Sequence, residues 1–391
     1  GRADPDALRI GAQVAASTVA MRFFENGLGR VFIERVIRIH DAQKAAGLQT
    51  FTFPYSEGRE EIEVLLAERI SKDGQRGPAL RISDSGPRGK HDGVYTDVAT
   101  KVVTFPSLAA GDTLHLRVRK ELIGRQNLFG DFFGAVEPIA GTLPTRSWRL
   151  VIESPRARTL AWGGKGAPTP TLTDAVLEGE PVRVHDFKVA AAGAVEIEPL
   201  MPPFLEVADF VSVSTYTSWA ALGSWYEALV APQLTLDTEL KHIAAEVTRG
   251  ARDERDKVRR LYEHVVTSTR YVGIELGIHG WKPYPVTEIH RRKYGDCKDK
   301  ASLLVALLRE AGIPANLALV RTANLGDIVD EPPSMLLFNH AIAYVPSLDL
   351  FLDGTAEQSG AFELPPLDQG AITLVVGAHG GHVSSRLARI P

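Results

Sequence analysis

Short runs of alternating apolar and polar residues recur through the first half of the chain. They are rich in β-branched residues, which together with this period is typical of half-buried strands. Clusters of Gly, Pro and Asp separate them, as in SKDGQRG and SDSGPRGKHDG. The runs that we interpret as strands are 30–40, 62–71, 101–108, 113–122 and 147–155. Short strands at this spacing favour an antiparallel β-rich domain, which we expect to span residues 1–210.

A helical period begins near residue 214. Apolar residues then recur at steps of three and four, which places them on one side of a helix. The positions that carry this period before residue 270 are Trp219, Leu222, Trp225, Leu229, Leu236, Leu240, Ile243, Val247, Val258, Leu261 and Val265. The two tryptophans fit a core position better than a ligand site. Another helix and several strands follow, so we expect an α+β protein with a second domain over 211–391.

Composition limits the classes of protein to consider. The 391 residues carry a net charge of −4 and show no basic stripe, which argues against nucleic acid as a partner. The longest purely aliphatic run, 303–308, is far too short for a membrane span. The chain begins at Gly1 rather than Met, so we expect a fragment or a processed form. The residues alone leave its localisation and oligomeric state open.

Cys297 is the single cysteine, which excludes an internal disulfide. Gly295 and Asp296 precede it with a turn and a candidate N-cap, and Gly312 and Pro314 end the helix that follows. Cys297 is then in the first helical turn, where unpaired N–H groups and the helix dipole favour a thiolate. Cys297 is therefore a candidate nucleophile. The alternative is an inert cysteine packed at a helix start.

A thiol nucleophile needs a base, and the base needs a group that orients it. The segment NHAIAYVPSLDLFLDGTA predicts a hairpin with His340 on its first strand and Asp353 on its second. A two-residue loop at 346–347 would set His340 directly opposite Asp353, and a loop two residues longer would make them diagonal neighbours on the same face. Either register lets the carboxylate face the imidazole. The alternative is a surface hairpin with an incidental ion pair.

The other histidines do not indicate a metal site. His279, His290, His379 and His382 lack a tight ligand spacing, and no second cysteine supports zinc. The glycine-rich segment GAHGG is not followed by a helix start, so it does not predict a phosphate loop. We therefore expect neither a metal nor a cofactor.

The order of Cys297, His340 and Asp353, with the sequences around them, resembles the transglutaminase-like superfamily, whose fold is similar to that of papain. The segments that carry this resemblance are RYVGIELGIHGWKPYPVTEIHRRKYGDC, YGDCKDKASLLVALLREAGIPANLALV, NHAIAYV and FLDGTA. The first half of the chain is similar to the bacterial domain of unknown function 3857, through RVIRIHDAQKAAGLQTFTFPY, VVTFPSLAAGDTLHLRVR and EIEPLMPPFLEVADFVSVSTYTSW. The resemblance implies a helix at Cys297 packed on an antiparallel sheet. It also implies an exported bacterial protein, periplasmic or extracellular, with a further C-terminal part.

The resemblance further implies thiol acyl transfer on a peptide or protein amide. Cys297 attacks the carbonyl, His340 protonates the departing amine and then activates the second nucleophile, and Asp353 orients His340. The N–H of Cys297 is the first oxyanion donor, and Trp281 is the candidate for the second, with Tyr294 behind it. Both aromatic residues also fit an ordinary core role. We expect the sulfur within about 4 Å of one ring nitrogen of His340. The other nitrogen should be about 2.7–3.2 Å from the Asp353 carboxylate.

Three functions remain open on the residues alone. Water as the second nucleophile makes the protein a peptidase or amidase, which is our first expectation, and an amine makes it a cross-linking transglutaminase. The third is a non-catalytic binding or scaffold module. The β-rich domain carries no clustered Cys, His or paired carboxylates, so we expect an accessory role for it in placing substrates. Segment 323–334, with Asp327, Asp330 and Glu331, is expected to be a mobile acidic loop beside the cleft or a plain solvated loop.

Overall fold

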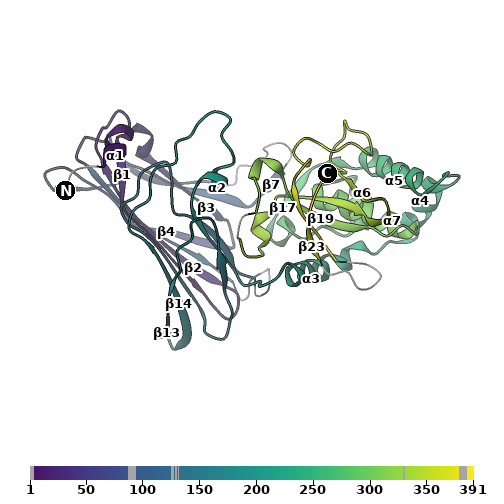
Figure 1. The fold of residues 1–391 in the computed structure, drawn as a ribbon, viewed down its shortest axis with the longest axis horizontal. Helices are drawn as coiled ribbons and strands as arrows, with labels where there is room; N and C mark the ends of the chain where they lie inside the picture. Colours follow the sequence, from purple (N-terminus) through teal and green to yellow (C-terminus); the bar gives the residue numbers. More distant parts are fainter. Residues whose placement is uncertain are drawn as a thin grey trace. The chain divides into compact units, whose positions relative to one another are not determined.

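The computed structural model describes residues 4–86, 94–124, 127, 130, 132–328, 331–377 and 385–391. The chain forms two compact units (Figure 1). The first comprises Gly1–Arg88, Asp97–Thr215 and Val329–Pro332, and the second comprises Gly89–Thr96, Tyr216–Ile328 and Pro333–Pro391. The first unit is rich in strands and the second combines helices with a five-stranded sheet, so the expected α+β class is confirmed.

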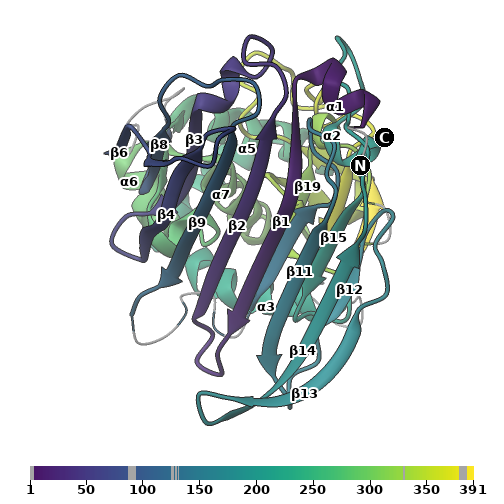
Figure 2. The ribbon, with the colours of Figure 1, turned by 90° about the vertical axis from the view of Figure 1, so that its left-hand side faces the viewer.

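An eight-stranded sheet forms the body of the first unit (Figure 2). Its order is β13 (Thr171–Leu177), β14 (Glu180–Val189), β11 (Trp148–Pro155), β1 (Ala12–Phe23), β2 (Gly29–Ile39), β9 (Thr113–Leu122), β4 (Glu60–Ile70) and β5 (Arg76–Pro78). Neighbours are antiparallel except β1 and β11, which run parallel. The sequence pattern missed β1 because Ala, Ser and Thr dominate it, and small residues carry a weak strand signal.

Two three-stranded sheets and short helices complete this unit. One sheet contains β3 (Thr50–Ser56), β8 (Val98–Thr104) and β6 (Arg81–Ser85), and the other contains β10 (Gly134–Pro138), β15 (Phe210–Ser214) and β12 (Ala161–Gly163). The helices are α1 (Pro5–Ile10), η1 (Ala46–Gln49) and α2 (Phe204–Val207). Buried Val103 of β8 packs with Leu114 of β9, and Val213 of β15 packs with Leu150 of β11. The core of the unit therefore lies between the large sheet and the two small ones.

Helix α7 (Cys297–Glu310) is the centre of the second unit. Its residues from Lys298 through Leu308 are all buried, and α4, α5, α6 and β20 contact it. The helices of the unit are α3 (Trp219–Val230), η2 (Ala231–Leu234), α4 (Thr238–Thr248), α5 (Glu254–Ser268), η3 (Gly277–Gly280) and α6 (Val286–Arg292). The predicted stripe residues Leu222, Leu240 and Val258 are fully buried. The helical period therefore identified the faces that build this core.

The sheet that α7 contacts has the order β21 (Leu350–Leu352), β20 (His340–Val345), β19 (Asn316–Arg321), β22 (Ile372–Val375) and β23 (Arg386–Arg389), and every pair is antiparallel. The short helices η4 (Ala323–Leu325) and η5 (Met335–Leu337) precede β20. The β20–β21 hairpin turns through η6 (Pro346–Leu348) and pairs Val345 with Leu350. This is the longer of the two loops considered, so the register makes His340 and Asp353 diagonal neighbours.

The second unit also contains a strand from the first half of the sequence. Strand β7 (Val94–Thr96) pairs in parallel with β17 (Gly273–Glu275). Strands β16 (Arg270–Tyr271) and β18 (Tyr294–Gly295) form a second short parallel pair directly before α7. Among the described residues, no helix is both long and apolar enough to cross a membrane.

Candidate active site

Cys297 is the first residue of α7, where the sequence placed it. Asp296 is the N-cap, and its Oδ1 accepts a hydrogen bond from the Asp299 N–H at 3.3 Å. The Asp299 Oδ2 accepts in return from the Asp296 N–H at 3.3 Å, which completes a capping box. A Cβ added at Gly295 would lie 2.6 Å from the Asp299 Cβ, so only glycine fits before this cap. The start of α7 is therefore held in one position.

Buried charges surround the start of α7. Asp299 accepts from Arg292 at 2.7 Å and from the N–H of Tyr284 at 2.9 Å. Lys298 forms an ion pair with Asp296 and is 4% exposed. Burial lowers the pKa of Lys298, but the charges of Asp296 and Cys297 raise it above its ordinary value. The Lys298 ammonium therefore stays charged at the start of α7.

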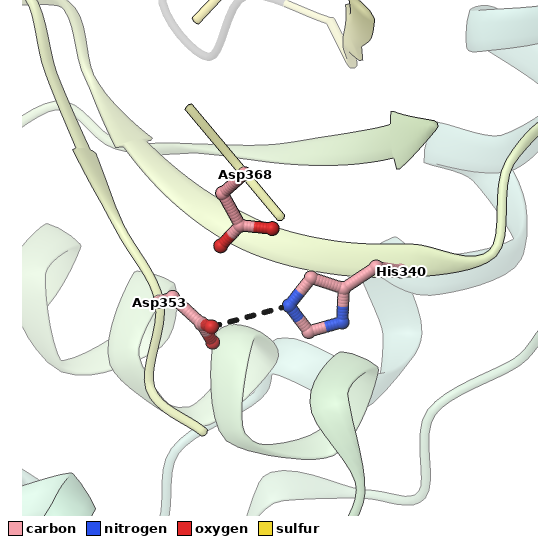
Figure 3. A group of neighbouring side chains, drawn as sticks. All are labelled: His340, Asp353 and Asp368. Carbon is pink, nitrogen blue, oxygen red and sulfur yellow. Dashed lines mark ion pairs between the residues drawn. The ribbon is translucent and has the colours of Figure 1, made fainter. Parts of the chain in front are cut away.

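His340, at the start of β20, lies between the sulfur and a carboxylate. Its Nε2 is 3.3 Å from the Asp353 Oδ2, just beyond the expected range (Figure 3). Cys297 and His340 line the same cavity, and Cys297 acts electrostatically on the ring. Burial alone would lower the pKa of His340, but these contacts with Asp353 and Cys297 raise it well above its usual value. Asp353 thus orients a ring that can hold a proton beside the cavity that Cys297 lines.

Asp353 follows β21 and is 3% exposed. Its Oδ1 accepts hydrogen bonds from the N–H and the hydroxyl of Thr355, at 2.8 and 2.7 Å. The Tyr262 hydroxyl donates to its backbone carbonyl at 2.9 Å. Burial raises the pKa of Asp353, but His340 and Thr355 outweigh it and lower the pKa below the ordinary value. Asp353 is therefore the charged partner of the imidazole.

Asp368 is a further carboxyl group that the sequence analysis did not identify. It is 2% exposed, and its carboxyl group lies near Asp353 and His340 (Figure 3). One ligand atom each of His340, Asp353 and Asp368 lies within 4.8 Å of the other two. That spacing alone would admit a small cation, but the two carboxyl groups already contact each other, so we do not assign the three as metal ligands. No sequence signal marked Asp368, because it is in the loop segment PPLDQG, outside any motif or periodic pattern.

A cavity of about 290 Å³ opens at the thiol and the imidazole. Its lining comprises Tyr226, Glu275, Gly280, Trp281, Cys297, Lys298, Leu319, Phe338, Asn339, His340 and Ala341. A larger cavity of about 400 Å³ in the same unit is lined by residues such as Glu227, Lys241 and Arg309. The described lining of that larger cavity contains neither cysteine nor histidine, so the smaller cavity is the candidate active site.

The two oxyanion candidates differ in whether they line the cavity. Trp281 lines the cavity, and its backbone carbonyl accepts a hydrogen bond from the Tyr226 hydroxyl at 3.1 Å. Tyr294 is not among the described residues of the lining. Its ring stacks with the Arg292 guanidinium, and its carbonyl accepts from the same side chain at 2.9 Å. The geometry therefore keeps Trp281 as a candidate donor and gives Tyr294 a role in holding Arg292.

The acidic segment 323–334 does not line the described cavity. Asp327 forms an exposed ion pair with Arg389 at 2.9 Å, and Glu331 is buried. Asp330 lies outside the described residues. An acidic rim at the cleft therefore receives no support from Asp327 or Glu331.

Two family models match the chain. Residues 241–345 match the transglutaminase-like superfamily, and residues 25–188 match a domain of unknown function with a solved structure, DUF3857. No curated protein matches. Both regions are those that the sequence motifs indicated.

The solved structures add a likeness of fold. A suspected protease from Parabacteroides distasonis has a TM-score of 0.74 at 18% identity, over 94% of this chain and 71% of that one. A suspected cysteine protease from Cytophaga hutchinsonii has a TM-score of 0.26 at 13% identity, over 57% of this chain and 79% of that one. The first likeness shows the fold, and the second score is too low to carry an argument.

Proposed function

We propose that this chain catalyses thiol-dependent acyl transfer on peptide or protein amides, with hydrolysis as the reaction. The premise is that the chain carries a DUF3857 region followed by a transglutaminase-like region. Cys297, His340 and Asp353 form the catalytic triad of this proposal. The observation that carries it is the position of His340, because its Nε2 lies 3.3 Å from the Asp353 carboxylate and its ring lines one cavity together with Cys297.

The first half of the reaction forms an acyl-enzyme. The Cys297 thiolate adds to the amide carbonyl. The new oxyanion then accepts a hydrogen bond from the backbone N–H of Cys297 at the start of α7. When the C–N bond breaks, the His340 imidazolium gives its proton to the amine nitrogen. Asp353 stabilises the imidazolium before this step and orients the neutral ring after it. Trp281, on the cavity wall, is the second oxyanion donor in this proposal.

The second half of the reaction releases the acid. The neutral His340 takes a proton from water, and the oxygen adds to the thioester carbonyl. The C–S bond then breaks, which frees a carboxylic acid and restores the thiolate and imidazolium. We propose water as the nucleophile because hydrolysis needs no second binding site for an amine.

The β-rich first unit is proposed to be an accessory domain that places or restricts substrates. The motivation is its chemistry, since His340, Asp353 and the single cysteine all belong to the second unit. A fragment that lacks the first unit and still acts on native substrate with full rate and selectivity would contradict this role.

Mass spectrometry of a peptide mixture incubated with the protein tests the proposed reaction. Cleaved or deamidated peptides are expected, and Cys297→Ala should produce none. Cross-linked peptides would replace hydrolysis with transamidation. Unchanged peptides, together with a Cys297 thiol that iodoacetamide alkylates slowly near pH 6, would favour the non-catalytic module.

A further inference from the structure

Two buried carboxyl groups meet beside the imidazole. Asp353 and Asp368 are 3% and 2% exposed, and one carboxyl oxygen of each lies within 4.8 Å of the other and of a ring nitrogen of His340. They come from different segments, since Asp353 follows β21 and Asp368 precedes β22. Figure 3 shows the Asp368 carboxyl directed toward Asp353 and His340. The proposed triad therefore has a fourth polar neighbour.

This proximity favours a shared proton. Two ionised carboxylates are both acceptors only, so they cannot hydrogen bond with each other. Two like charges close together and out of water also repel each other strongly. The pair is therefore most stable when one group is a carboxylic acid that donates its O–H to the other.

The surroundings decide which group holds the proton. Asp353 accepts two hydrogen bonds from Thr355 and faces the Nε2 of His340, and such contacts favour its charged form. Asp368 lacks comparable donors, and its Oδ2 receives no hydrogen bond from any residue that the structure describes. Burial and the charge of Asp353 raise the pKa of Asp368 to about 6. The proton is therefore on Asp368.

We propose that Asp368 is a positioning residue for the reaction, whose carboxylic acid donates a hydrogen bond to the Asp353 carboxylate and holds it against His340. This inference rests on the proposed function, because the alignment matters only if His340 acts on Cys297. Asp368 itself is not among the described residues that line the cavity at Cys297.

The groups that face this carboxyl pair are few. His340 of β20 interacts electrostatically with both carboxyl groups. The groups that interact electrostatically with Asp353 alone are Lys300 of α7, Tyr262 of α5 and Tyr271 of β16. Burial raises the pKa of both tyrosines, to about 12 for Tyr262, so both stay neutral below pH 8. A change in this cluster between pH 5 and 8 is therefore assigned to Asp368 or His340.

The test uses the full chain, because its single cysteine makes iodoacetamide alkylation specific for Cys297. Rates are measured from pH 5 to 8 for the wild type, Asp368→Ala and Asp368→Asn. Asparagine keeps an N–H donor for Asp353 and does not titrate. At pH 5.5 we expect Asp368→Ala to react about tenfold more slowly than the wild type, the effect of losing one charge-assisted hydrogen bond. Asp368→Asn should stay within about twofold of the wild type.

The pH dependence separates positioning from general stability. The wild-type advantage over Asp368→Ala should shrink as the pH rises through about 6, because Asp368 loses its proton there. The advantage of Asp368→Asn over Asp368→Ala should stay constant. Asp256→Asn is the matched control, since Asp256 is also buried but is bound by Arg252, Arg259 and Arg260. Its rate relative to the wild type should not vary with pH.

Four results would overturn the inference. The first is that Asp368→Ala is alkylated at the wild-type rate at pH 5.5, and the second is that Asp368→Ala and Asp368→Asn lose equal rate. The third is that Asp256→Asn shows the same pH-dependent loss of rate. The fourth is that the chain binds one Zn²⁺ tightly and Asp368→Asn abolishes this binding. His340→Ala separates this inference from the proposed function. If His340→Ala reacts slowly while Asp368→Ala reacts like the wild type, only the inference fails. If His340→Ala also reacts like the wild type, both fail.

Discussion

At the scale of single residues, the behaviour of His340 depends on a competition between burial and contacts. Burial by itself disfavours an imidazolium, but Asp353 and Cys297 outweigh it, and the pKa of His340 is well above its usual value. At pH 6 the ring is therefore protonated. Cys297 lines the same cavity as this imidazolium, and its sulfur is expected to react rapidly with iodoacetamide at that pH.

Substitutions in the triad should differ in a defined order. Cys297→Ala should abolish acyl transfer and leave the fold intact, because Cys297 is at a helix start beside a cavity. His340→Ala should lower the rate by about 100- to 10,000-fold, since the leaving amine loses its proton donor. Asp353→Asn should cost less, because Asp353 orients the ring and does not react. Peptide turnover measures the rates, and circular dichroism checks the fold. Equal rates for the wild type and His340→Ala would contradict the triad.

The proton on Asp368 also predicts how stability changes with pH. The pKa of Asp368 is raised to about 6 in the folded state, so its contribution to stability is complete below its unfolded pKa, near 4, and is lost as the pH rises through 6. Asparagine does not titrate. The free energy of unfolding of Asp368→Asn, relative to that of the wild type, should therefore increase by about 1–3 kcal/mol between pH 4.5 and pH 7.

Urea denaturation at the two pH values measures this difference. Asp256→Asn is again the control, because its arginine partners lower the pKa of Asp256 and place its titration below pH 4. Its stability relative to the wild type should stay constant over the interval. A constant difference for Asp368→Asn as well would show that Asp368 is ionised in the folded protein.

At the scale of elements, the position of the thiol depends on how α7 begins. The capping box places Asp296 and Asp299 in the first turn, and Arg292 of the preceding helix neutralises Asp299 at 2.7 Å. Both aspartates are buried, so each depends on its partner to stay there. The start of α7 is therefore specified by charges more than by apolar contacts.

Removing one of these charges should destabilise the second unit strongly. Asp299→Ala leaves the Arg292 guanidinium without its carboxylate in a buried site, which should cost about 3–5 kcal/mol. Burial raises the pKa of Asp299 to about 6, so urea unfolding at pH 8 tests the charged form. Asp253→Ala is the control, since Asp253 caps α5 without an ion pair to Arg292. It should cost about 1 kcal/mol. Equal losses in the two variants would show that only the cap matters.

At the scale of the whole molecule, the second unit depends on a segment far away in the sequence. Strand β7, from the first half of the chain, pairs with β17, and β17 carries Glu275 of the cavity lining. A cut at residue 216 would therefore remove a strand from the unit that carries Cys297. The β17 backbone would lose these hydrogen-bond partners.

A fragment of residues 216–391 should therefore be less stable than the same unit in the full chain. We expect its thermal unfolding to begin several degrees lower, because a difference of about 1 kcal/mol shifts the midpoint by about 2–4 °C in a domain of this size. Alkylation of Cys297 in the fragment should also slow, since the wall that contains Glu275 loses its support. If the second unit unfolds identically with and without residues 89–96, then β7 is dispensable for its stability.

The sequence by itself determined the features that depend on local spacing. The helical period identified buried Leu222, Leu240 and Val258, and the turn before Cys297 predicted the cap at Asp296. The period of two on a hairpin predicted that His340 and Asp353 share a face in either register. These inferences succeed because backbone geometry relates residues that are close in sequence.

Only the tertiary structure decided the rest. The hairpin loop length, the parallel pairing of β7 with β17 and the contact of Asp368 with Asp353 each join residues that no local period relates. Asp368 is in a loop without a motif, and it meets Asp353 because the chain returns to the sheet at β22. Long-range contacts of this kind follow from packing the whole chain around α7. The free energy of that packing depends on many segments together, so no single segment predicts it.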